Sequence, residues 1–367
     1  MSRGAPNRLA GVRIAVLGVG LIGGSIGLAA RERAGAEVTG WGPRPETLET
    51  ALGKGAIARI ASTVEDAVHD ADAVFACAPV ESLPHLVKQA LAAAGGETVV
   101  TDAGSTKRSL VEAIEDERFI GGHPVAGAET AGVRNARADL FDGAAWYLTP
   151  RANTSGILFE RLHRLIVSFG ARPTAIDAAT HDRMLAAVSH LPHVLANVLA
   201  NQAASEVRAG EPIPRTGPSF RDMTRVAGAN SDIWTGIYLT NRDAVAAEVD
   251  GVVARLQEVA QALRAADAGA IRAWNDSARE DRRRLLGAGL EAGAATELRL
   301  SVPNRPGIVA QVALALGRGG VNIADMALAP APDMRSGSMT LWVAGADAER
   351  AIQLIEQLGF PTAVVEG

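Results

Sequence analysis

Residues 121–127 of the chain read GGHPVAG and place one histidine in a segment that is otherwise poor in reactive side chains. Pro124 favours an extended backbone at His123, and the flanking glycines remove side-chain bulk around the ring. Neutral imidazole is the usual proton acceptor near neutral pH. We therefore expect His123 to lie in the open, close to a ligand, as a general base. A structural loop histidine is the alternative interpretation.

A serine stands in a second segment, TDAGSTKRSL at residues 101–110, which ends one strand-like run and begins a helix. Ser105 and Thr106 are suitable N-caps for that helix. In an open parallel sheet, ligands bind beyond the carboxyl ends of the strands, so Ser105 and His123 could share one substrate hydroxyl there. The strand ends expected at this crevice are Gly18, Ala78-Pro79, Asp102–Ser105 and Gly121–His123.

A glycine pattern near the N-terminus predicts a dinucleotide-binding turn. The sequence IAVLGVGLIGGS at residues 14–25 contains G-x-G-x-x-G between a strand-like run and a helix. Gly18 allows the tight turn, Gly20 lets a pyrophosphate approach the backbone, and Gly23 allows close helix–strand packing. The N–H groups at the start of the helix bind the anion. The residues expected to hold the cofactor are Gly18, Gly20, Leu21, Ile22, Gly23, Arg44 and Pro79.

The segment after the second strand-like run bears on the choice between NAD and NADP. It reads TGWGPRPE at residues 39–46, with no carboxylate where NAD-binding proteins hold the ribose hydroxyls. Arg44 lies just beyond and suits a 2′-phosphate. The sequence therefore favours NADP, with NAD as the alternative if Arg44 is only a solvated surface residue.

The elements that must position these residues change in pattern along the chain. Residues 11–177 alternate short apolar runs with helical segments, which is typical of a Rossmann-type domain with a parallel sheet. From 178 to 290 the strands stop, and long helical segments form an all-α domain interrupted by GEPIPRTGPS. These long apolar helices lack enough sheet to cover them, which predicts a homodimer. We therefore expect an NAD(P)-binding domain over 1–177 and a helical substrate-binding and dimerisation domain over 178–290.

A third, smaller domain is expected over residues 296–367. ELRLSVPN alternates like a strand, and PGIVAQVALALGRGG is a helix with proline at its start and glycine at its end. Two strands, a second helix and a last strand follow. The order β-α-β-β-α-β predicts a ferredoxin-like α+β fold.

Composition limits the classes of function. The 367 residues carry a net charge of −5 and are 48% hydrophobic, which is ordinary for a globular enzyme of two or three domains and does not indicate nucleic acid binding. Cys77 is the only cysteine, so no intrachain disulfide forms. The N-terminus is better interpreted as a first strand than as an export signal, and no apolar run suits a membrane span. A cytoplasmic location is expected.

Five motifs in a fixed order resemble the prephenate/arogenate dehydrogenase family of tyrosine biosynthesis. They are GVGLIGGS, TDAGSTK, GGHPVAG, SHLPH and FRDMTRVAGANSDIW. The segment PNRPGIVAQVALALGRGGVNIADM, at residues 303–326, resembles an ACT domain. The two resemblances together extend over nearly the whole chain.

The resemblance implies oxidative decarboxylation of prephenate to 4-hydroxyphenylpyruvate, with hydride transfer to NAD(P)⁺. His123 would accept the proton of the ring hydroxyl, and Ser105 would assist it. His193, the second histidine of SHLPH, would line the substrate pocket. Arg225 would bind the side-chain carboxylate, with Trp234 nearby.

Several questions stay open on sequence alone. Prephenate and arogenate differ by a keto or amino group, so either could be the substrate. The ACT resemblance implies an aromatic amino acid effector such as tyrosine. The residues expected to bind the effector are Asn304, Gly307, Asn322 and Ile323.

Three competing interpretations are weaker. β-Hydroxyacid and 6-phosphogluconate-type dehydrogenases use a lysine after the Rossmann unit, and this chain has no lysine after Lys107. A non-catalytic dinucleotide sensor would keep the glycines but would need neither His123 nor Ser105. His181, His190 and His193 do not have the spacing or the cysteine neighbours of a common zinc site, so no metal is expected.

Overall fold

The computed structural model describes residues 11–365 except 128–130, 206–214, 288–294, 304–307, 309–310, 313–314, 317–318, 322 and 331–335. The chain forms two compact units, one ending at Val253 and one beginning at Ala254. Each unit is described by itself. Within the described part of the chain, the helices are too short or too polar for a membrane span.

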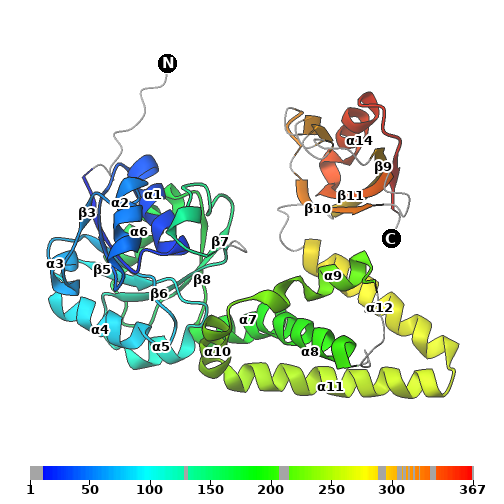
Figure 1. Cartoon of the computed structure of the whole chain (residues 1–367), viewed down its shortest axis with the longest axis horizontal. Helices are drawn as coiled ribbons and strands as arrows, with labels where there is room; N and C mark the ends of the chain where they lie inside the picture. The colour runs from blue at the N-terminus through cyan, green and yellow to red at the C-terminus, as the bar shows by residue number, and fades with distance from the viewer. Residues whose placement is uncertain are drawn as a thin grey trace. The chain divides into compact units, whose positions relative to one another are not determined.

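The first unit is built on one sheet with the strand order β3-β2-β1-β4-β5-β6-β7-β8 (Figure 1). The first six positions have the order of a Rossmann domain. The strands are β1 (Arg13–Leu17), β2 (Glu37–Trp41), β3 (Arg59–Ile60), β4 (Ala73–Ala76), β5 (Val99–Asp102), β6 (Phe119–Pro124), β7 (Ala145–Thr149) and β8 (Arg172–Ala175). The sheet is parallel as predicted, except that β7 runs antiparallel to β6. The short strands β3 and β8 were not predicted.

Helices cover both faces of this sheet (Figure 1). On one face lie α1 (Leu21–Ala34), α2 (Pro45–Gly53) and α6 (Gly156–Ser168). On the other lie α3 (Val64–Val68), α4 (Leu83–Ala93) and α5 (Arg108–Ala113). Because both faces are covered, the central strands are mostly apolar, and β4 is apolar and buried at all four residues.

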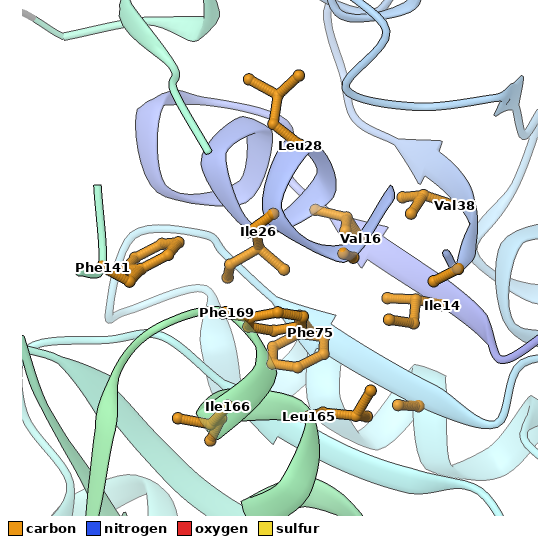
Figure 2. Close-up of a cluster of buried hydrophobic side chains, with 14 of the residues drawn as sticks. Ile14, Val16, Ile26, Leu28, Val38, Phe75, Phe141, Leu165, Ile166 and Phe169 are labelled. Atoms are coloured by element: carbon orange, nitrogen blue, oxygen red, sulfur yellow. The ribbon is translucent and has the colours of Figure 1, made fainter. Parts of the chain in front are cut away.

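The packing on the first face holds α1 and α6 against β4 (Figure 2). Phe75 of β4 points into this layer, where its ring centroid lies 5.9 Å from that of Phe169, just after α6. Ile26 of α1 and Ile166 of α6 belong to the same buried cluster. This packing fixes the start of α1 relative to the carboxyl ends of the central strands.

Helices follow β8, as the sequence predicted. α7 begins after Asp177, whose side chain accepts the N–H of Thr180 at 2.8 Å. A π-helical turn, η2, connects α7 to α8. The helical elements are the short 3₁₀ turn η1 (Val133–Asn135) within the Rossmann part, α7 (Ala178–Leu185), η2 (Ala186–His190), α8 (Leu191–Ser205), α9 (Pro218–Thr224), the 3₁₀ turn η3 (Arg225–Gly228), α10 (Ser231–Thr240), α11 (Arg242–Arg264) and α12 (Ala268–Gly287).

The second unit contains a four-stranded sheet with the order β10-β11-β9-β12, in which all neighbours are antiparallel. The described residues within 308–316 are helical. The predicted β-α-β-β-α-β order is therefore confirmed. The other elements are β9 (Ala295–Pro303), β10 (Ile323–Pro330), β11 (Ser336–Ala344), the 3₁₀ turn η4 (Gly345–Asp347), α14 (Ala348–Gln357) and β12 (Thr362–Val364).

Most of the predicted effector residues cannot be placed in this fold. Asn304, Gly307 and Asn322 lie outside the described residues, and Ile323 is the first residue of β10. Their assignment as an effector site stays a prediction.

Candidate active site

A cavity of about 350 Å³ lies over the carboxyl ends of β1, β2 and β4. The sequence order of the strands reverses between β1 and β4, which is where dinucleotides bind in such sheets. The cavity is lined by Gly18, Val19, Gly20, Trp41, Gly42, Pro43, Arg44, Thr47, Leu48, Cys77, Ala78, Pro79, Ser82, His85, Leu86 and Gln89.

The three glycines of the turn have different physical roles. Gly18 has φ +99°, and a Cβ there would lie 2.3 Å from the Cys77 carbonyl oxygen. A Cβ at Gly23 would lie 2.1 Å from the Gly18 carbonyl oxygen. A Cβ at Gly20 would have no atom within 4 Å, so this glycine borders open space. The turn therefore packs tightly at its first and third glycines and leaves room for a pyrophosphate at the second.

The start of α1 fits the same ligand. The helix begins at Leu21 with Gly20 as N-cap, and no side chain caps its first N–H groups. Leu21 and Ile22 pack partly against the core, so their backbone at the helix start is held in place. Unsatisfied N–H groups at a helix start favour an anion.

Arg44 lies at the rim of this cavity. It is exposed, and its backbone forms the N-cap of α2. Of the described residues that line the cavity, none is acidic, and Arg44 is the only arginine or lysine. Pro79 follows β4 and lines the same cavity.

The expectation that His123 lies in the open is wrong. His123 is a residue of β6, pairs with Tyr147 of β7 and is 8% exposed. Burial lowers the pKa of His123 well below its ordinary value, and the charges that His181, Lys107 and His190 can carry lower it further. The ring is therefore neutral at neutral pH.

The glycines before His123 make room for protein atoms. A Cβ at Gly121 would lie 2.3 Å from Oγ1 of Thr149, and a Cβ at Gly122 would lie 2.5 Å from the Asp102 carbonyl oxygen. They permit β6 to pack closely between β5 and β7. Because β5 and β7 pack closely against β6 at these two glycines, the His123 ring has little freedom to change its orientation.

His181, which sequence reasoning did not assign, contacts His123, and Asp182 contacts His181 in turn. Nδ1 of His123 lies 2.8 Å from Nε2 of His181, and Nδ1 of His181 lies 2.7 Å from Oδ1 of Asp182. The Asp182 carboxylate accepts the backbone N–H groups of Lys107 and Arg108 at 2.7 and 2.9 Å. The only signal in the sequence was the pair HD at residues 181–182, close to the start of a helix.

Ser105 lies between β5 and α5 and is half-buried. The predicted capping role is wrong for both Ser105 and Thr106, because the N-cap position is Lys107 and Asp182 accepts the N–H groups there. Thr106 instead hydrogen-bonds to Thr240 at 2.9 Å. Within the described part of the chain, no hydrogen bond of the Ser105 side chain is found, so its hydroxyl is available to a ligand.

A buried ion pair between Lys107 and Asp102 supports this edge of the sheet. Both side chains are completely buried. Asp102 also accepts the N–H of Gly104 at 2.8 Å and the N–H of Gly122 at 3.0 Å. The pair therefore ties the segment carrying Ser105 to the strand carrying His123, although sequence reasoning did not identify it.

His193 and Trp234 form a stacked pair. The ring centroids are 3.6 Å apart, and Nδ1 of His193 hydrogen-bonds to the Tyr238 hydroxyl. Nε2 of His193 is buried, and a hydrogen bond with the backbone of Val226 partly opposes the effect of burial on the pKa of the ring. Burial lowers the pKa of His193, so this ring is also neutral.

Arg225 and Trp234 line a second cavity of about 640 Å³. Arg225 begins η3 and is exposed, and Trp234 belongs to α10. Gly127, from the segment that follows His123, lines the same cavity. The predicted substrate residues His193, Arg225 and Trp234 are therefore close together, linked through Trp234. Among the described residues, no cluster of three or more His, Cys, Asp or Glu side chains could hold a metal ion.

The chain is similar to known proteins along most of its length. Residues 26–174 match the family model described as prephenate dehydrogenase, nucleotide-binding domain, and residues 177–275 match prephenate dehydrogenase, dimerization domain. A prephenate dehydrogenase of Bacillus subtilis is 28% identical over 94% of this chain and 95% of its own length. A prephenate dehydrogenase of Lactococcus lactis is 30% identical over 82% of this chain and 85% of its own length.

A solved structure has the same fold over most of the chain. It is prephenate dehydrogenase from Aquifex aeolicus in complex with hydroxyphenyl propionate and NAD⁺. The sequence identity is 26%, the TM-score is 0.71, and the match covers 76% of this chain and 99% of the other.

Proposed function

Because the chain belongs to the prephenate dehydrogenase family, we propose that it catalyses the oxidative decarboxylation of prephenate to 4-hydroxyphenylpyruvate. The observation that carries the proposal is the position of His123 near the end of β6, next to β5, which leads to Ser105. Burial at this position lowers the pKa of the imidazole. An unprotonated ring is the form that can accept the hydroxyl proton.

The proposed reaction needs a base, an anchor and a hydride acceptor. His123 takes the proton from the ring hydroxyl, and the half-buried hydroxyl of Ser105 hydrogen-bonds to the same oxygen. The bound nicotinamide supplies the hydride acceptor. As the ring carboxylate leaves as carbon dioxide, its bonding electrons make the ring aromatic, and the proton on His123 returns to the oxygen to give the phenol. A positioned base typically contributes about 10²–10⁴-fold in rate.

The substrate's other end is assigned to the cavity beside α10. Arg225 supplies a permanent positive charge for the side-chain carboxylate. The stacked rings of His193 and Trp234 supply an aromatic wall, of which Trp234 lines the cavity. These roles rest on the cavity lining, which includes Arg225 and Trp234, and on the stacking of His193 on Trp234.

NADP is the proposed cofactor. The support is the exposed Arg44 at the cavity rim together with the lack of acidic groups among the described lining residues. A carboxylate there would bind the ribose 2′-hydroxyl of NAD, whereas an arginine accommodates a 2′-phosphate.

Steady-state kinetics with prephenate and arogenate, each against NAD⁺ and NADP⁺, test these proposals together. We expect NADPH formation at 340 nm with prephenate, and a higher kcat/KM for NADP⁺ than for NAD⁺. Turnover of arogenate alone would reassign the substrate. No turnover with any pair would favour the non-catalytic dinucleotide sensor.

The proposed quaternary structure is a homodimer formed by the helical region. It is supported by the family model matched over 177–275 and by exposed apolar side chains of α11, namely Val253, Leu256 and Leu263. We further propose a cytoplasmic location. Light scattering at two protein concentrations tests the dimer, and a monomer mass at both would contradict it.

The proposed effector is an aromatic amino acid such as tyrosine, bound by the ferredoxin-like ACT domain. The support is the β-α-β-β-α-β order and the motif at 303–326. Tyrosine inhibition that persists unchanged in an Asn304→Ala, Asn322→Ala double variant would remove the support for this domain as the binding site.

A further inference from the structure

We propose that His181 and Asp182 are positioning residues, which fix the tautomer of His123 so that its Nε2 atom is the unprotonated base. The inference rests on the proposed function and extends it by two residues. It follows from the direction in which each hydrogen bond must run.

The direction is set at Asp182. Backbone N–H groups can only donate, and those of Lys107 and Arg108 point to Oδ1 and Oδ2 at 2.7 and 2.9 Å. Both carboxylate oxygens therefore act as acceptors. The third contact, from Nδ1 of His181 to Oδ1 at 2.7 Å, must then be a hydrogen bond that His181 donates.

The same reasoning sets the direction of the hydrogen bond between the rings of His181 and His123. A neutral imidazole has one N–H and one acceptor nitrogen, so His181 with a proton on Nδ1 presents an acceptor at Nε2. His123 must therefore donate from Nδ1 across the 2.8 Å contact. The proton of neutral His123 is then on Nδ1, and Nε2 is left as the acceptor for the substrate hydroxyl.

Burial makes this arrangement specific. His181 is completely buried, Asp182 is 3% exposed, and the rings of His123 and His181 meet edge to face at 5.0 Å. The Tyr147 ring packs against His181 on another side, with 5.5 Å between centroids. In such surroundings an unpaired polar group is costly, so the reversed hydrogen-bond direction is strongly disfavoured.

The chain of hydrogen bonds from His123 through His181 to Asp182, called the relay below, also suits the proton balance of the proposed reaction. When Nε2 takes the substrate proton, His123 becomes an imidazolium whose Nδ1–H already faces the Nε2 lone pair of His181 and, beyond it, the Asp182 carboxylate. The cation is stabilised without rearrangement. The proton returns from Nε2 to the ring oxygen in the phenol, so no net proton has to leave.

Nitrogen-15 NMR of histidine-labelled protein reads the tautomer directly, without substrate or cofactor. We expect an unprotonated Nε2 and a protonated Nδ1 for His123 at pH 7, with its signals assigned by their loss in a His123→Asn variant. A His123 ring protonated at Nε2 in the wild-type chain would overturn the proposal.

Two substitutions at His181 separate positioning from mere packing. His181→Phe fills the site but offers no acceptor, so we expect the His123 tautomer to change and kcat to fall at least about 100-fold, within the range of a lost general base. His181→Gln keeps an oxygen acceptor, so kcat should stay within about 10-fold of wild type. Equal losses in both variants, with unchanged KM and melting temperature, would contradict the relay.

The pH profile supplies an independent measurement. The charged and titratable groups around His123 are His181, His190, Asp182, Tyr147 and the Lys107–Asp102 pair. His181 is neutral in the proposed arrangement, but the positive charge it gains when protonated in acid is, after burial, the next cause of the low pKa of His123. His181→Gln removes that charge, so it should move the acidic limb of kcat/KM to higher pH. An unmoved limb would count against the contact.

Asp182→Asn and a surface control complete the design. The Asp182→Asn variant would lack the carboxylate that fixes the proton on Nδ1 of His181, so we expect the His123 tautomer to change and kcat to fall; an unchanged tautomer would contradict the proposal. In the Ser-His-Asp triad, where the carboxylate contacts the base itself, the corresponding change lowers kcat about 10⁴-fold. His69→Gln, at a position whose side chain is 82% exposed, should match wild type. If wild type turns over neither prephenate nor arogenate, the proposed function fails, yet the NMR result still decides the tautomer.

Discussion

The imidazole of His193 lies flat on the indole of Trp234, with 3.6 Å between the ring centroids and 2° between the planes. His193 belongs to α8 and Trp234 to α10, so the stack joins two helices beside the Arg225 cavity. His190, one turn earlier, meets the same indole edge to face at 6.1 Å. The indole therefore contacts both histidines and holds α8 and α10 together on this side of the proposed substrate site.

Trp234→Leu should weaken substrate binding more than turnover. An aromatic pair contributes about 0.5–1.5 kcal/mol beyond buried area, so we expect the KM for prephenate to rise about 2- to 12-fold. Trp234→Phe keeps an aromatic face and should lie closer to wild type. Initial-rate measurements decide this, and an unchanged KM in the leucine variant would remove Trp234 from the substrate site.

His123→Asn should abolish most of the turnover while leaving the nucleotide site intact. Without a proton acceptor, kcat should fall by about 10²–10⁴-fold. NADP⁺ affinity, followed by quenching of tryptophan fluorescence, should match wild type because the cofactor cavity lies over other strands. A kcat within a few-fold of wild type would contradict the base assignment.

Arg225→Ala should mainly raise KM. A hydrogen bond to a charged group contributes about 1.5–3 kcal/mol, which corresponds to about a 10- to 150-fold increase. The change in kcat should be smaller if the anchor binds ground and transition states equally. Arg221→Ala, on the preceding helix α9, is the matched control for lost positive charge. Equal KM values in the two variants would exclude a specific anchor.

Gly122→Ala should destabilise the fold, whereas Gly251→Ala should not. The new methyl group at position 122 would lie 2.5 Å from the Asp102 carbonyl oxygen, and overpacking typically costs about 1–3 kcal/mol. Gly251 lies within α11 with no atom within 4 Å of the added Cβ, where alanine stabilises a helix by about 0.5–1 kcal/mol. Thermal melting of both variants measures the difference, and equal melting temperatures would refute the close packing of β6.

The free energy of unfolding should decrease as the pH falls from 6.5 to about 4. Burial lowers the pKa of His190 from 6.5 to about 4, with His181 and His193 lowering it further and Asp182 opposing them. Between these values the unfolded chain binds a proton that the folded chain does not, so acid favours unfolding. Urea titrations across this range measure the slope, which should be shallower in His190→Gln. An identical slope would assign the effect to other groups.

The elements with a strong local pattern could be predicted from the sequence. The turn at Gly18–Gly23 could be predicted because the spacing of its glycines is a local pattern, although the contact that requires Gly18 comes from the Cys77 carbonyl oxygen after β4. The apolar runs of β1, β4 and β5 are equally local signals. β3 and β8 were not predicted, because β3 has only two residues and β8 reads RPTA, without an apolar run.

The site itself depends on contacts between distant segments. His123 and His181 are 58 residues apart, and nothing near either residue indicates the other. The N-cap assignment of Ser105 failed for the same reason, since the groups that a local cap would satisfy are bound by Asp182, 75 residues from Lys107. Gly121 and Gly122 were interpreted as space for a ligand, but neighbouring strands occupy that space; only Gly127 borders a cavity among the three glycines of the motif.

The burial of Lys107 also determines how the protein responds to amine chemistry. Lys54, Lys88 and Lys107 are the only lysines in the chain, and the first two are exposed. Acylating reagents should therefore modify Lys54 and Lys88, with the terminal amine, and spare Lys107 until the fold opens. Coupling to a biosensor chip through lysine would attach the molecule by its Rossmann part and leave the ferredoxin-like unit chemically untouched.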